Sequence, residues 1–124
     1  MITKDITICG RQVTLAYCYA TEIAYKDLTG EDFIDYAQHA VESIQQERDP
    51  DTKRTICAVL ACLLAYYGDN EAPVTDADLM KEAKPAELGM AILTILDLRR
   101  QFYTVPAGEP EDKPSDEEGK KTKN

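Results

Sequence analysis

The stretch ICAVLACLLAYY, residues 56–67, carries no charge and is the most apolar part of the chain. Its larger side chains recur at helical spacing, while alanine and cysteine occupy the other sides. A helix that is apolar on every side is buried on every side, so we predict a central helix that ends at Gly68. Asp49 and Pro50 are predicted as its cap and first residue. The larger side chains form one stripe: Ile56, Val59, Leu60, Leu63, Leu64 and Tyr67.

Two further helices are predicted after the central one. Thr75 begins the first of them, because Asp78 lies at the spacing of a capping box. Val74 and Leu79 flank this start as a hydrophobic staple. Pro85 breaks the short helix and opens the last one, since proline is favoured in a first helical turn. The side chains predicted to face inward from the last helix are Leu88, Ile92, Ile95, Leu96 and Phe102.

Before the central helix, residues 20–36 (ATEIAYKDLTGEDFIDY) look like one amphipathic helix that is interrupted in the middle. We predict a first helix over residues 19–29, which Gly30 ends in the left-handed conformation. Asp32 then caps a second helix over residues 32–46. The apolar side chains at helical spacing in these two helices are Ile23, Ala24, Leu28, Phe33, Tyr36, Ala37, Ala40, Val41 and Ile44.

The N-terminal sequence ITICGRQVTL, residues 6–15, alternates apolar and polar side chains on both sides of Gly10. This pattern predicts a β-hairpin with a two-residue turn, Gly10-Arg11, of type II′, which takes glycine at its first central position. Ile8 would then pair with Val13, Ile6 with Leu15, and Thr7 with Thr14. A lone hairpin is unstable in water, so its apolar face must lie on the helices.

Composition places limits on function. The net charge is −9, with 23 acidic and 14 basic residues, which disfavours binding to nucleic acid or to an anionic membrane surface. Residues 106–124 (PAGEPEDKPSDEEGKKTKN) lack large apolar side chains and are predicted to be a disordered charged tail. The predicted fold is therefore mainly α: residues 1–105 form one domain, with the hairpin packed on about five helices. No signal peptide or membrane span is recognised, which indicates the cytoplasm.

No catalytic, metal or cofactor site is predicted. His39 is the only histidine and lies in a helix without a nucleophile beside it, so a solvated position is the better interpretation. The acidic pairs Asp49/Asp51 and Asp76/Asp78 stand at helix starts, where carboxylates are favoured. The four cysteines, which form no CxxC motif and no zinc ligand set, are predicted to be buried reduced thiols: Cys9, Cys18, Cys57 and Cys62. Arg99 and Arg100 lie at a helix end, where cations are favoured.

The order of the N-terminal elements resembles the tail assembly chaperones of long-tailed bacteriophages and prophages. Many of them open with a strand–turn–strand such as ITICGRQVTLAY, followed by a helix that closes in Leu-Thr-Gly, as Leu28, Thr29 and Gly30 do here. The resemblance covers residues 1–36 best and the helical remainder in outline.

This resemblance implies a non-enzymatic cytoplasmic protein that is absent from the finished virion. It would keep the tape-measure protein soluble while tail-tube subunits polymerise around it, and both proteins are the implied partners. An extended helical client exposes apolar surface that aggregates unless it is covered, and grooves between helices can cover it. The sequence itself assigns no partner-binding residues, and self-association of the chain stays open.

In this family a −1 ribosomal frameshift often appends a second domain. Gly119, Lys120 and Lys121 can be encoded by a purine run that permits such slippage, although lysine-rich ends are also common. The codons at these positions test the idea directly.

The sequence is compatible with two other functions besides the chaperone. The first is a structural adaptor or connector that is retained in the virion, and the second is a regulatory or anti-host-defence protein that binds a host protein. Detection of the chain in purified particles separates the adaptor from the chaperone.

Overall fold

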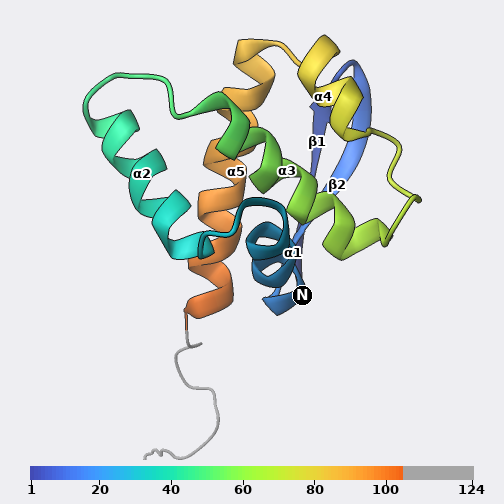
Figure 1. Cartoon of the computed structure of the whole chain (residues 1–124), viewed down its shortest axis with the longest axis horizontal. Coiled ribbons are helices and arrows are strands. Elements are labelled where there is room, and N and C mark those ends of the chain that lie inside the picture. The colour runs from blue at the N-terminus through green and yellow to red at the C-terminus, as the bar shows by residue number, and fades with distance from the viewer. Residues whose placement is uncertain (105–124) are drawn as a thin grey trace, which may run out of the picture.

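The computed structural model describes residues 1–104, and the predicted tail and the frameshift positions Gly119, Lys120 and Lys121 lie outside these residues. The chain is mainly helical, with an N-terminal antiparallel hairpin packed on the helices, as predicted (Figure 1). The elements in order are β1 (Ile2–Ile8), β2 (Arg11–Tyr17), α1 (Tyr19–Thr29), α2 (Phe33–Gln45), α3 (Thr52–Tyr67), α4 (Asp76–Glu82) and α5 (Pro85–Tyr103).

Helix α3 is the centre of the molecule, because it contacts β2 and all four other helices. Helix α5 packs against both strands and against α3 (Figure 1). No residue from 54 to 65 is exposed, which confirms the central position predicted from residues 56–67. The predicted helix end is also confirmed, since Gly68 follows the last residue of α3 and its N–H bonds to the carbonyl of Leu64 at 2.9 Å.

The hairpin forms, but the predicted register is wrong by two residues. The turn residues are Cys9 and Gly10, with φ values of 55° and 72°, and Ile8 pairs with Arg11. Two positive φ values in a two-residue loop are typical of a type I′ turn, which matches the twist of the strands. A shift of two residues preserves the faces, so Ile6 still lies on the apolar side, opposite Val13.

The predicted helix ends are right where the signal is local. Gly30 has φ 80° and ψ 0° and ends α1 after Thr29. Thr75 forms the predicted capping box, accepting from Asp78 N at 3.2 Å while Asp78 Oδ2 accepts from Thr75 N at 3.0 Å. Pro85 is the first residue of α5.

Of the other two predicted caps, Asp32 is right in position only and Asp49 is wrong. Asp32 occupies the cap position of α2, but its carboxylate makes no capping hydrogen bond and accepts from Lys26 Nζ at 2.9 Å instead. The cap of α3 is Asp51 rather than Asp49, and Asp51 Oδ1 accepts from Arg54 N at 2.9 Å. Pro50 therefore precedes the helix. An aspartate caps only where the chain outside the helix aims its side chain at the free N–H groups.

The buried face of α1 differs from the predicted one. Tyr25 and Thr21 are buried, whereas Ile23 is 62% exposed and Leu28 is 41% exposed. An aromatic cluster turns the helix this way, because the Tyr25 ring packs on Phe33 at 5.0 Å between centroids. Helix α2 is similar: Phe33, Tyr36, Ala37 and Ala40 are buried, but Val41 and Ile44 are exposed.

The predicted inward face of α5 is confirmed. Ile92 and Ile95 are buried, and the other three predicted side chains, Leu88, Leu96 and Phe102, are partly buried against the core.

Candidate partner-binding groove

An open apolar groove runs along α3 between α1 and α4. It consists of two adjoining hollows, of about 440 Å³ and 600 Å³, and Leu28 lines both of them. Ile23 and Leu28 come from α1, Leu60 from α3 and Met80 from α4. We call this feature the α3 groove. Its lining residues are Ala20, Ile23, Ala24, Asp27, Leu28, Thr52, Lys53, Ile56, Cys57, Leu60, Leu64, Ala65, Asp69, Asp76 and Met80.

The α3 groove exists because the apolar surface of α3 is wider than its neighbours cover. Ala58, Ala61 and Cys62 are fully buried under the hairpin and the other helices, whereas Leu60 and Leu64 are half-buried. The prediction that α3 is buried on every side is therefore right for the core faces and incomplete for this one. On the core side of α3, the small side chains of alanine and cysteine let the neighbouring elements approach closely. Leu60 and Leu64 lie on the opposite, open side of the helix.

The dimensions of the α3 groove suit a helix rather than a small molecule. Its lining on α3 runs from Thr52 to Ala65, a length of about 20 Å at 1.5 Å per residue. Its most exposed apolar side chains are Ile23 and Met80, each 62% exposed. Sites for small molecules bury most of the ligand surface in a closed cleft, while an open apolar groove of this length matches helix-in-groove recognition.

The rim of the α3 groove is acidic. Asp27 and Asp69 lie at one hollow and Asp76 at the other, and Lys53 is the one basic residue among the lining side chains. Within the described residues, none of these three carboxylates forms an ion pair. A partner with lysine or arginine beside its apolar surface is therefore favoured electrostatically.

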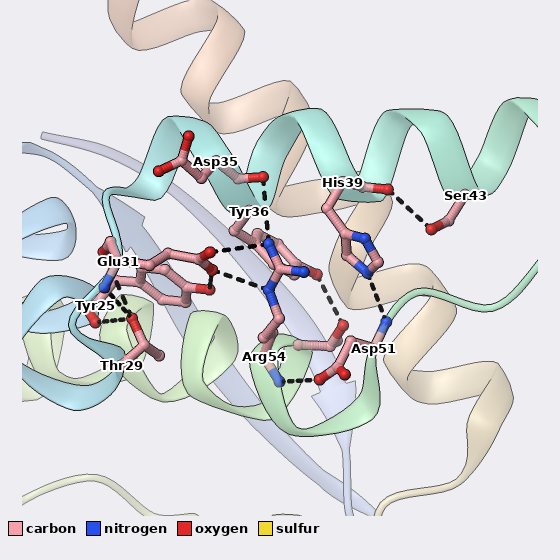
Figure 2. A network of polar contacts seen from close by, with 10 residues as sticks. Tyr25, Thr29, Glu31, Asp35, Tyr36, His39, Ser43, Asp51 and Arg54 are labelled. Atoms are coloured by element: carbon pink, nitrogen blue, oxygen red, sulfur yellow. Dashed lines mark hydrogen bonds and ion pairs between the residues drawn. The ribbon is translucent and has the colours of Figure 1, made fainter.

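A network of polar contacts fixes the turn between α1 and α2 against the start of α3 (Figure 2). The carboxylate of Glu31 faces the guanidinium of Arg54, which donates from Nε at 2.9 Å and from Nη2 at 3.0 Å. Tyr25 donates its hydroxyl to the same carboxylate. Thr29 donates to the carbonyl of Tyr25 at 2.8 Å and accepts from Glu31 N at 3.1 Å. Leu28 is thus held in the groove by residues that directly follow it.

The ionisation of this network follows from its contacts. Partial burial opposes ionisation of Glu31, but the hydrogen bonds from Tyr25 and Arg54 outweigh it and lower the pKa of the carboxyl. Burial, and then the hydrogen bond to Glu31, raise the pKa of Tyr25 well above its ordinary value. Burial also raises the pKa of Tyr36 to about 12. Tyr36 shares a hydrogen bond of 2.9 Å with Thr55. At neutral pH, Glu31 is therefore a carboxylate that faces the Arg54 guanidinium, and Tyr25 and Tyr36 are neutral phenols.

His39 extends the same network, which corrects the prediction that it is merely solvated. It is half-buried, and Figure 2 shows its ring directed at the chain just before α3. The Nε2 atom accepts a hydrogen bond from Asp51 N at 2.8 Å. The bond to the ring comes from the residue that caps α3, and among residues 1–104 no cysteine or serine side chain is hydrogen-bonded to it. The geometry indicates a structural role.

Of the remaining residues singled out in the sequence, Cys57 lines the α3 groove, and the others lie apart from it or serve the fold. Cys62 is buried as predicted, whereas Cys9, Cys18 and Cys57 are half-buried, and all four are free thiols. Asp78 pairs with Arg11 at 3.0 Å besides its capping contacts. Among residues 1–104 there is no cluster of three or more histidine, cysteine or acidic side chains that would hold a metal ion. The same part of the chain contains no helix of the length and apolar content needed to cross a membrane.

Sequence reasoning did not find two features of this site. The pairing of Glu31 with Arg54 joins residues from different elements, and neither residue has a sequence pattern of its own. The exposure of Ile23 was missed because its helical spacing is equally compatible with a core position. One signal was present: α1 has two apolar faces, and only one of them can face the core.

Searches with protein-family models, among curated proteins and among solved structures found no match to this chain.

Proposed function

We infer that this chain is a non-enzymatic chaperone in phage tail assembly, which acts in the bacterial cytoplasm. It would keep the tape-measure protein soluble and help to recruit tail-tube subunits, and it would leave before the virion is complete. The observation that carries the proposal is the open α3 groove. The resemblance of residues 1–36 to tail assembly chaperones supports it, and Leu28 of the Leu-Thr-Gly sequence lies in that groove.

The physical basis is the covering of apolar surface on an extended helical client. A client helix of about four turns would lie along α3, with its apolar side chains against Ile23, Leu60 and Met80. The acidic rim selects clients that carry lysine or arginine beside the apolar face. Affinity for one site is modest, since partly exposed side chains bury limited area, and many copies bound along one long client would add avidity.

The test measures how the full chain affects the solubility of the tape-measure protein encoded with it. Co-expression with the wild-type chain should keep the tape-measure protein in the supernatant after centrifugation. Met80→Glu should return it to the pellet, because a charge in the α3 groove opposes apolar contact.

The chain offers a matched control for this substitution. Met90→Glu changes the same residue type at the same exposure of 62%, but on α5 and outside the lining of the α3 groove. It should behave as wild type. Equal solubility of the tape-measure protein with and without the chain refutes the proposal, and detection of the chain as a stoichiometric component of purified particles would favour the virion adaptor instead.

A further inference from the structure

A second apolar surface lies on α2, away from the α3 groove. Ile34 and Val41 line an open hollow of about 520 Å³ with Ala37, Gln38, Glu42 and, from α5, Arg99. Ile34, Val41 and Ile44 are 43%, 41% and 42% exposed. Figure 1 shows α2 at the edge of the molecule, on the side away from the hairpin. Helix α2 is therefore covered on one face only.

The apolar residues on the open face of α2 follow a heptad pattern. Ile34, Ala37, Val41 and Ile44 are separated by three, four and three residues, the spacing of the a and d positions that form the contact seam between paired helices. Ile34, Val41 and Ile44 are exposed, whereas Ala37 is only 6% exposed and lines the hollow between them. Phe33 and Ala40, on one side of the seam, are buried in the core. The helix thus has a wider apolar face than its own fold uses.

We propose that this seam packs against the same seam of a second copy of the chain, with the two α2 helices antiparallel about a two-fold axis. An antiparallel alignment places Ile34 opposite Ile44 and Ala37 opposite Val41. Val41 of each copy then enters the hollow that the small, buried Ala37 of the other copy leaves, which is the complementary packing that helix pairs need. A two-fold interface is self-complementary by construction, so one surface supplies both halves.

The charges around the seam favour this occupant. Copies with a net charge of −9 repel one another, yet the positions beside the seam carry the uncharged Gln38 and Gln45. Arg99 and Glu42 line the same hollow without an ion pair between them or with any other described residue. Arg99 Nε is buried and has no hydrogen-bond partner within residues 1–104. In the antiparallel pair, Glu42 of one copy approaches Arg99 of the other. The two-fold axis repeats this contact, so the interface contains two such pairs of opposite charge.

This interface is independent of the proposed function. The α3 groove is formed by α1, α3 and α4, whereas the seam lies on α2 beside α5. A pair joined through α2 therefore presents two free α3 grooves.

Sedimentation velocity of the full chain tests the proposal over a concentration range of about 1 to 300 µM, because an interface below the standard size is weak. The wild-type chain should pass from monomer to dimer within this range. Val41→Glu should raise the dissociation constant by roughly tenfold or more, since like charges then meet at the seam. The matched control is Ile23→Glu, an exposed isoleucine of the α3 groove, which should dimerise as wild type.

A charge exchange tests the pairing itself. Glu42→Arg and Arg99→Glu should each weaken the dimer, and the double variant should restore it. Arg99 also lies over the Tyr103 ring, 4.9 Å from its centroid, so circular dichroism must first show that the variants are folded. If the Arg99 variants do not fold, Glu42→Arg against Glu42→Gln makes the same comparison. A wild-type chain that stays monomeric throughout the range, or a dimer unaffected by Val41→Glu, overturns the proposal, and neither result bears on binding in the α3 groove.

Discussion

Replacement of Gly30 by alanine should destabilise the protein through its backbone alone. Gly30 has φ 80° and ψ 0°, and a Cβ added there meets no atom within 4 Å. The substitution therefore causes no clash, and the left-handed conformation costs alanine about 1–2 kcal/mol. Alanine also restricts the unfolded chain, which offsets about 0.4–1 kcal/mol. The net loss is about 1 kcal/mol, or a fall in Tm of about 4 °C for a domain of this size.

Two other glycines provide matched comparisons for the same substitution. Gly89 lies inside α5 without a positive φ, and its added Cβ also meets nothing within 4 Å. Gly89→Ala should therefore stabilise the protein by about 0.5–1 kcal/mol. Gly68 has φ 81° and ψ −179°, a region that only glycine adopts readily. Gly68→Ala should consequently lose more stability than Gly30→Ala.

The assay is thermal and urea unfolding of the full chain, followed by far-ultraviolet circular dichroism. The expected order of stability is Gly89→Ala above wild type, then Gly30→Ala, then Gly68→Ala. An unchanged or higher Tm for Gly30→Ala would refute the reasoning, because it would show that the left-handed turn does not limit the stability of the α1–α2 connection.

Three further predictions concern ionisation and capping. Partial burial opposes ionisation of Glu31, but its hydrogen bonds lower the pKa of the carboxyl. Its contribution to stability is therefore present above its ordinary pKa near 4.5 and is lost as the pH falls through the lowered value. In Glu31→Gln, the free energy of unfolding in urea should depend less on pH over that acidic range, and an unchanged pH dependence would contradict this. Asp51→Ala should cost about 1 kcal/mol by removing the cap of α3, whereas Asp32→Ala, which removes no capping hydrogen bond, should cost clearly less in the same unfolding assay. Cys62 is buried, and burial raises the pKa of its thiol, so a thiol reagent should modify it only after unfolding. The half-buried Cys57 should react in the native protein. Labelling is read by mass spectrometry, and rapid labelling of Cys62 in the native protein would refute its burial.

The local signals in the sequence were sufficient to predict the fold class and most helix ends. Gly30, Thr75 and Pro85 act through their own backbone or through a neighbour three residues away, so their effect is independent of the rest of the chain. The composition of residues 56–67 likewise identifies α3 as central, because apolar side chains occupy every side of the helix. The hairpin was predictable as an element, but its register depended on Cys9 adopting φ 55°, which sequence preference disfavours for a residue other than glycine.

The packing of the elements settled what the residue pattern leaves open. Helix α1 has two apolar faces, and the aromatic cluster around Phe33 selects Tyr25 for the core and leaves Ile23 in the α3 groove. Glu31 and Arg54 meet across 23 positions of the chain, a contact that neither residue signals. Such features depend on which surfaces remain uncovered after the core has formed, and that outcome is a property of all the elements together rather than of any one segment.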